Sequence, residues 1–232
     1  MSLPSLALSP AARISCFAVG REASPILVVD DAFAGAEAIA AYGRTEAVFG
    51  TPATAYPGLN ATLSDDAFLS LIEDLRSHLN RVYAIPDTAP VAGTGYFGLV
   101  SLKPEDLTPG QSIPHVDNIG DRGLAAVAYF CDESFGGTGF YRHRATGFER
   151  LTRDNIMTYD AVLATETRQG LPQAYTVGDH VLFECIGTTE ARFNRLVLYN
   201  CNLLHSGQVD PARLSADPAK GRLTLNAFLA PI

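Results

Sequence analysis

The sequence is short of positive charge and of paired cysteines. Lys and Arg number 17 against 25 Asp and Glu residues, which gives a formal net charge of −8. Nucleic acids and anionic membrane surfaces select basic protein surfaces, so this balance argues against both as partners. The four cysteines contain no Cys-x-x-Cys pair, and neither a zinc knuckle nor a disulfide scaffold is indicated. We expect reduced, mostly buried thiols, as in a cytoplasmic protein.

The sequence also lacks segments that would direct it into or across a membrane. Residues 1–15 have neither the basic start nor the long apolar run of a secretory signal. No apolar run approaches the roughly 20 residues that a membrane-spanning helix needs. Hydrophobic residues make up 47% of the 232 positions and charged residues 18%, which is enough apolar material for one large core. These features predict a soluble, cytoplasmic protein with a single domain over residues 1–232.

A change in residue pattern divides the chain into a helical support over residues 33–83 and a β-rich core over residues 94–229. An alanine-rich segment, 33–48, and an amphipathic segment, 65–83, are typical of helices that pack on a sheet. Short runs rich in Val, Leu, Tyr and Phe then alternate with Gly, Pro and Asp turns, which is typical of antiparallel strands. The predicted strands cover residues 94–102, 112–117, 123–131, 138–144, 147–151, 156–163, 173–177, 180–186, 193–204 and 222–229.

His115 and Asp117 are the first candidate metal ligands. They have the same parity, so on a strand both side chains would project to one face, and Pro114 and Asn118 place them at a strand end. The alternative is a capping aspartate beside a surface histidine. His205 ends the run 195–204, in which Val197, Tyr199, Cys201 and Leu203 would share its face, and it is a candidate third ligand or a core histidine with a single hydrogen bond. Two histidines and one carboxylate are the facial donor set of an oxygen-activating iron centre.

Arg222 and Thr224 share one face of the last predicted strand with Asn226. An inward guanidinium needs a counter-charge, because a buried cation without a partner is costly. No acid lies on that face of the strand, so a ligand carboxylate is the expected partner, gripped by the arginine and assisted by the threonine hydroxyl. An arginine at a strand edge in water is the alternative.

Two further motifs have plainer interpretations. Arg142 and Arg144 alternate around His143, and a solvated strand edge is favoured over a binding site for an acidic substrate group. The spacing Gly93-x-Gly95-x-x-Gly98 is read as turn chemistry, because no helix follows it to receive a phosphate.

In this order, His-x-Asp, a Gly-Gly turn, a distal His and Arg-x-Thr resemble the Fe(II)/2-oxoglutarate-dependent dioxygenases. The resemblance is to their prolyl-4-hydroxylase-like branch, and within it to an uncharacterised bacterial subgroup with a Phe-Tyr-Arg-His-Arg string, here residues 140–144. It covers roughly residues 26–229. The segments that carry it besides the candidate ligands are 26–31, 125–130, 135–140 and 177–183.

The resemblance implies a mainly β fold with flanking helices, a double-stranded β-helix of the jelly-roll, cupin-like type. His115, Asp117 and His205 would then bind Fe(II), while Arg222 and Thr224 hold the far carboxylate of 2-oxoglutarate. Tyr129 or Tyr96 would add a hydrogen bond to that carboxylate, and the choice between them stays open. The loop between His205 and Arg222 is longer than is usual in the family.

The implied activity is hydroxylation of a C–H bond with molecular oxygen, in an amino-acid, peptidyl or small-metabolite substrate. Tyr96, Phe97, Tyr129 and Tyr141 are predicted pocket walls. A non-catalytic metal-binding jelly-roll module, with zinc at the same ligands, is the alternative. A cupin-type isomerase or lyase is a third possibility. An inward Arg222 favours the oxygenase, since a structural module has no evident need for it. Oligomeric state does not follow from the sequence.

Overall fold

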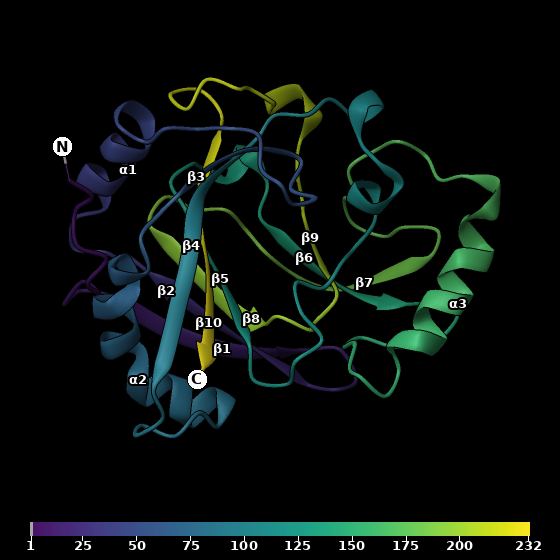
Figure 1. Ribbon diagram of the computed structural model, residues 1–232, viewed down its shortest axis with the longest axis horizontal. Coiled ribbons are helices and arrows are strands. Elements are labelled where there is room, and N and C mark those ends of the chain that lie inside the picture. The colour runs from purple at the N-terminus through teal and green to yellow at the C-terminus, as the bar shows by residue number, and fades with distance from the viewer. Residues whose placement is uncertain (1) are drawn as a thin grey trace.

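The computed structural model describes residues 2–232, and its framework is two antiparallel β-sheets (Figure 1). The larger sheet has the strand order β1-β2-β8-β5-β10-β4-β3 and the smaller has the order β7-β6-β9. The larger sheet comprises β1 (Arg13–Val19), β2 (Ser24–Asp30), β3 (Gly58–Thr62), β4 (Val91–Val100), β5 (Leu124–Tyr129), β8 (Arg195–Asn200) and β10 (Arg222–Pro231). The smaller sheet comprises β6 (Thr138–His143), β7 (Phe183–Thr189) and β9 (His205–Gly207). The predicted fold class, a mainly β double-stranded β-helix with flanking helices, is confirmed.

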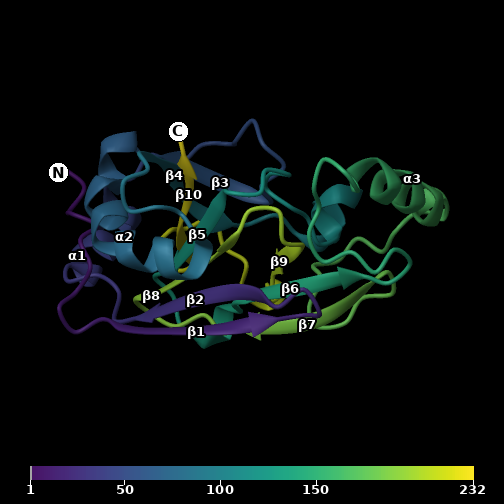
Figure 2. The ribbon, with the colours of Figure 1, turned by 90° about the horizontal axis from the view of Figure 1, so that it is seen from below.

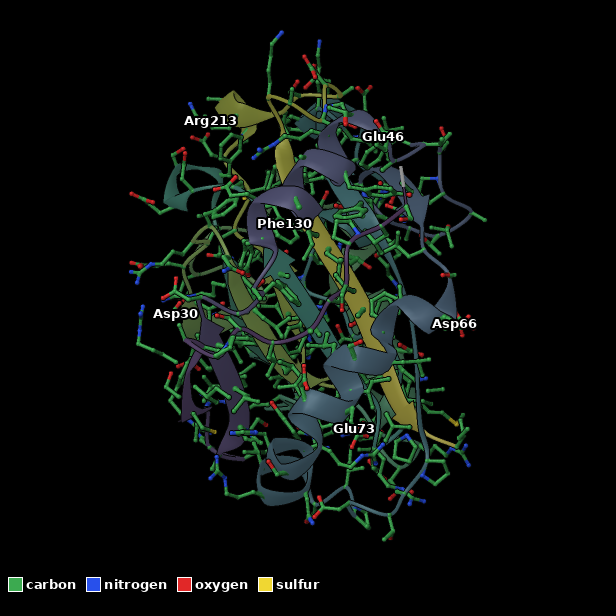
Figure 3. The ribbon with its side chains drawn as sticks, turned by 90° about the vertical axis from the view of Figure 1, so that its left-hand side faces the viewer. Asp30, Glu46, Asp66, Glu73, Phe130 and Arg213 are labelled. Carbon is green, nitrogen blue, oxygen red and sulfur yellow. The ribbon has the colours of Figure 1, made fainter. Side chains whose placement is uncertain are left out.

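Helices α1 (Ala36–Thr45) and α2 (Leu69–Tyr83) cover the outer face of the larger sheet, as Figure 3 shows from their side. The apolar positions of α2 recur at helical spacing, and Leu71, Leu75 and Leu79 are buried against that face. Figure 2 shows the third helix, α3 (Ile156–Glu166), at the opposite end of the molecule, beyond the smaller sheet. Both predicted helices of the support region, residues 33–83, are therefore present, and β3 lies between them.

Strands of the larger sheet supply two cores, because successive side chains of a strand point to opposite faces. On β8, Leu196 and Leu198 pack toward the helices, whereas Val197 and Tyr199 pack toward the smaller sheet. Between the sheets, the Tyr199 and Phe140 rings meet edge to face with centroids 5.2 Å apart. Each large apolar side chain buried in this way contributes about 1.5–3 kcal/mol to folding. The inner layer between the sheets is where the candidate site lies.

One predicted strand, 156–163, is wrong, because that segment forms α3. Residues Ile156, Tyr159 and Leu163 recur every three or four positions and pack beside Phe183 of β7. A short apolar run of this kind fits a strand and a helix equally well by composition, and only its packing partner decides.

The predicted strand 193–204 is also wrong in its extent. The chain leaves the larger sheet after Asn200, where the Leu203 amide donates to the Asn200 carbonyl oxygen at 3.0 Å, and joins the smaller sheet at His205. The predicted strands 112–117 and 147–151 are reduced to isolated bridges at His115 and Arg150, and 173–177 forms no strand.

The glycines at positions 93, 95 and 98 lie inside β4 and form no turn, so that interpretation is wrong. A Cβ atom at Gly93 would come within 2.8 Å of the Phe68 side chain, so the glycine lets the support region pack closely on the strand. Within the part of the chain that the structure describes, no helix has the length and apolar character needed to cross a bilayer. The single-domain boundary, 1–232, stays a prediction.

Candidate metal centre and ligand cavity

His115 and His205 lie side by side because their backbones pair directly. Each amide N–H donates to the carbonyl oxygen of the other residue, and both N–O distances are 2.9 Å. Directly opposed residues of an antiparallel pair project their side chains from the same face. The two imidazole centroids are accordingly 4.5 Å apart. The expected proximity of these histidines is present, through a single bridge beside β9.

Asp117 brings a carboxylate to the same point from the loop that follows His115. Its amide donates to the Cys201 carbonyl oxygen at 2.9 Å, which fixes the loop against the turn between β8 and β9. Its Oδ1 is 3.7 Å from His115 Nε2, and its Oδ2 is 3.4 Å from His205 Nε2. One ligand atom from each of the three residues lies within 4.8 Å of the other two, a spacing that a single metal ion can bridge.

The protonation states of the histidines suit metal binding. His205 Nδ1 lies 2.9 Å from the Leu203 carbonyl oxygen, which can only accept, so Nδ1 carries the proton and Nε2 is left as a donor to a metal. Burial lowers the pKa of His115, the neighbouring His205 lowers it further, and Asp117 opposes the shift. The His115 side chain keeps 54% exposure, so water screens part of this effect. The neutral imidazole is the form that binds metals.

A cavity of about 430 Å³ opens beside the three side chains, between the two sheets. Inward residues of β4, β5, β8 and β10 form its floor. Its lining includes the three candidate ligands together with Tyr56, Tyr96, Val127, Tyr199, Arg222 and Phe228. Tyr199 also packs its ring on His205, with centroids 4.7 Å apart. The cavity is therefore mostly apolar at its walls, with polar groups gathered at the candidate metal ligands and around Arg222.

Arg222 lies in this cavity as a buried cation held by backbone carbonyls. Its Nε and Nη2 atoms donate to the carbonyl oxygens of Gly136 and Gly137, each at 3.0 Å, and its guanidinium lies 5.4 Å from the Tyr129 ring centroid. A Cβ atom at Gly137 would fall 1.7 Å from the Thr189 carbonyl oxygen, so the turn can approach this closely only as glycine. Within residues 2–232, the hydrogen-bond acceptors of Arg222 are these two backbone carbonyls, and no carboxylate forms an ion pair with it.

The other residues predicted to bind the co-substrate differ in whether they reach the cavity. The Tyr129 hydroxyl is 2.6 Å from Thr138 Oγ1, beneath Arg222, and Tyr129 does not line the cavity. Thr224 is fully buried and does not line the cavity; its hydroxyl donates to the Gly98 carbonyl oxygen at 3.4 Å and accepts from Asn226 Nδ2 at 3.0 Å. Tyr96 lines the cavity. Its exposure to the cavity favours it over Tyr129 as a group that a ligand can reach.

Of the four predicted wall aromatics, only Tyr96 faces the cavity. Phe97 points to the helix side of the sheet and is buried in that core, and Tyr141 packs with the residues that hold α3. Adjacent residues on one strand point to opposite faces of the sheet, so Tyr96 and Phe97 could not both be cavity walls.

Tyr56 is a cavity residue that sequence reasoning missed. It belongs to the loop before β3, and its ring meets Tyr96 edge to face with centroids 5.6 Å apart. Nothing in the spacing of residues 50–62 distinguishes this tyrosine, because its place depends on how the loop folds over β4. Its hydroxyl oxygen is buried, and no residue of the described chain hydrogen-bonds with it.

Comparison with known families gives one assignment. Residues 10–229 match the family described as "Family of unknown function (DUF6445)". The chain belongs to the DUF6445 family. No curated protein matches the sequence.

Three solved structures resemble this DUF6445 chain. The epimerase SnoN from nogalamycin biosynthesis, described as non-heme and α-ketoglutarate-dependent, has a TM-score of 0.48 at 12% identity over 89% of this chain and 77% of SnoN. HygX from Streptomyces hygroscopicus, with nickel, 2-oxoglutarate and hygromycin B bound, has a TM-score of 0.48 at 16% identity over 90% and 84%. EvdO2 from Micromonospora carbonacea var. aurantiaca has a TM-score of 0.43 at 14% identity over 89% and 86%. The assignment of a function to the DUF6445 chain therefore depends on its own cavity side chains.

The Arg142-His143-Arg144 motif of the DUF6445 chain lies outside the cavity, and its reading as a solvated edge is wrong for two of three residues. Arg142 is buried and donates from Nε to Glu149 at 2.8 Å and from Nη1 to Glu184 at 2.7 Å. His143 is fully buried against α3. Only Arg144 is partly exposed. Glu149 from a nearby loop, Glu184 from β7 and Glu166 from α3 turn the motif into a structural ion-pair group.

Proposed function

We propose that this protein is an Fe(II)- and 2-oxoglutarate-dependent oxygenase. The observation that carries the proposal is the convergence of His115, Asp117 and His205 on one point of a cavity that also contains the buried Arg222. A triad alone would serve zinc equally well. A buried guanidinium without an acidic partner needs an anion from outside the protein, and a diacid co-substrate supplies one.

The donor set fits a ferrous ion. Two neutral imidazoles and a carboxylate occupy one face of the coordination sphere and leave the other face for small molecules. His115, Asp117 and His205 would hold the ion, and the Leu203 carbonyl would keep His205 in the tautomer that binds it. When bound, iron and 2-oxoglutarate supply the activation of molecular oxygen that oxidises an otherwise unreactive C–H bond.

The co-substrate end of the cavity also fits. Arg222 would grip the far carboxylate, with its fork oriented by the Gly136 and Gly137 carbonyls. Tyr96 would assist from the wall, and Thr224 would lie beneath the cavity lining. The Tyr199 ring beside His205 and the apolar lining would exclude water from the reacting groups.

The finer assignments belong to the same proposal. We place the chain in the prolyl-4-hydroxylase-like branch, acting as a cytoplasmic hydroxylase on an amino-acid, peptidyl or small-metabolite substrate. The order of the candidate residues along the chain supports this placement. The negative net charge supports a substrate other than nucleic acid.

Anaerobic titration of the apo-protein with Fe(II) and 2-oxoglutarate tests the proposal. A visible charge-transfer band should appear only when both are present and should be absent in His115→Ala. His180→Ala is the matched control, because that histidine lies outside the cavity and its substitution should leave the band unchanged. Absence of the band in the wild-type protein, with zinc retained tightly instead, would favour the non-catalytic metal-binding module.

A further inference from the structure

Residues 54–57 form one wall of the candidate cavity, although they belong to a loop outside both sheets. Thr54, Ala55, Tyr56 and Pro57 all line it. Protein contacts hold the backbone on either side of Tyr56: Gln111 Nε2 donates to the Ala55 carbonyl oxygen at 3.0 Å. The amides of residues 101 and 102 donate to the Pro57 carbonyl oxygen at 3.1 and 3.3 Å. The loop therefore has a defined path, with Tyr56 at its centre pointing inward.

The Tyr56 hydroxyl lies at the polar end of the cavity floor. Gly98 has no side chain, and the space where its Cβ would stand is filled by two groups: Tyr56 Oη would be 2.5 Å and Asn226 Nδ2 2.6 Å from that atom. Gly98 pairs in register with Thr224 on β10, two residues from Arg222. The hydroxyl thus reaches the row of residues expected to hold the co-substrate carboxylate.

This hydroxyl is a donor without an acceptor. It is buried, and none of the described residues completes a hydrogen bond with it. Burial raises the pKa of Tyr56 to about 12, opposed by the Arg222 charge and by the nearby Thr224 hydroxyl, which lies outside hydrogen-bonding geometry in this structure, so the phenol keeps its proton at neutral pH. A buried polar group of this kind costs about 1–3 kcal/mol unless a partner satisfies it.

We propose that Tyr56 donates a hydrogen bond to the far carboxylate of the bound diacid and so fixes residues 54–57 as a wall of the substrate site. This inference rests on the proposed function, because the diacid is its acceptor. Tyr56 is then a positioning residue with two effects: it strengthens co-substrate binding, and its hydrogen bond to the diacid further restrains residues 54–57, which already form the wall.

The test compares Tyr56→Phe with Tyr175→Phe in anaerobic Fe(II)-loaded protein. Tyr175 lines the same cavity, but its hydroxyl already donates to the Leu102 carbonyl oxygen at 2.7 Å. The readouts are the 2-oxoglutarate affinity by calorimetry and amide hydrogen exchange over residues 51–57 with and without 2-oxoglutarate. For Tyr56→Phe we expect about tenfold weaker affinity, the scale of one hydrogen bond to a charged group, and no protection of the loop. Tyr175→Phe should bind 2-oxoglutarate within about twofold of the wild type and keep the protection.

The outcomes distinguish a failure of the Tyr56 inference from a failure of the oxygenase proposal. If the wild-type protein binds 2-oxoglutarate but exchange over residues 51–57 does not slow, the inference is wrong and the oxygenase proposal stands. Equal 2-oxoglutarate affinity in Tyr56→Phe and the wild type would also show that the inference is wrong while the oxygenase proposal stands. If the Fe(II)-loaded wild type does not bind 2-oxoglutarate at all, the proposed function fails and the inference fails with it. The hydrogen-exchange measurement on the wild type needs no variant, so it tests the Tyr56 inference even if a variant folds poorly.

Discussion

Replacing Arg222 with leucine should separate co-substrate binding from metal binding. The leucine keeps apolar bulk but removes the guanidinium that donates to the Gly136 and Gly137 carbonyls. The buried Gly137 carbonyl and the partly buried Gly136 carbonyl lose their donors, at up to about 1–3 kcal/mol each, while the cost of burying the charge disappears. We expect a net loss of about 2 kcal/mol in the free energy of unfolding, measured by urea denaturation of the apo-protein.

The effect on 2-oxoglutarate should be larger than the effect on stability. A bidentate charged contact to a carboxylate is worth about 3 kcal/mol, so the affinity should fall by about 100-fold. Iron affinity should stay within about threefold, because the three candidate ligands lie on other segments of the chain. Anaerobic calorimetry with Fe(II), followed by 2-oxoglutarate, measures both. Arg222→Lys keeps the charge without the fork and should recover only part of the lost affinity.

An unchanged 2-oxoglutarate affinity in Arg222→Leu would refute this reasoning and move the carboxylate anchor elsewhere. Loss of iron binding together with 2-oxoglutarate binding would also count against it, provided that circular dichroism shows the variant to be folded.

Three further perturbations test other parts of the account. Asp117→Asn should weaken iron binding by at least about tenfold in a chelator competition while the melting temperature changes little, because the change removes a ligand charge and keeps the shape; unaltered iron affinity would contradict its role. Gly137→Ala should lose at least about 2 kcal/mol of stability in urea, because its Cβ would meet a carbonyl oxygen at 1.7 Å. Gly50→Ala, with open space around it, should lose less than about 0.5 kcal/mol, and equal losses would show that the close approach is unimportant. The hydrogen bond from Arg195 lowers the pKa of Asp30, so its contribution to stability is present above the usual carboxyl pKa and fades as pH falls through the lowered value. Asp30→Asn should therefore be less stable than the wild type at pH 7 and approach it in strong acid, and a difference that is constant with pH would contradict the linkage.

The candidate ligands could be proposed from the sequence because the proposal depends on residue types and their order, which do not require a detailed knowledge of the fold. His115, Asp117 and His205 come together in the structure and Arg222 lines the same cavity, although the strand on which the parity of His115 and Asp117 was argued is reduced to one bridge. The prediction depended on residue type and order along the chain. It did not need the exact strand boundaries, which were wrong around His205.

What could not be predicted depends on contacts between segments far apart in the chain. Tyr56 enters the cavity because a loop folds over β4 where Gly98 leaves space, and neither feature is visible in a stretch of residues read alone. Arg142 is buried because Glu149 and Glu184 arrive from other segments. Helix α3 was read as a strand because its apolar run has no pattern that excludes either structure.

The most direct test of the central claim is an anaerobic crystal structure of the protein grown with Fe(II) and 2-oxoglutarate. The account predicts one iron ion bound by His115, Asp117 and His205, with the diacid chelating the ion and its far carboxylate on Arg222. An ion bound elsewhere, or a diacid that leaves Arg222 without an anionic partner, would contradict it.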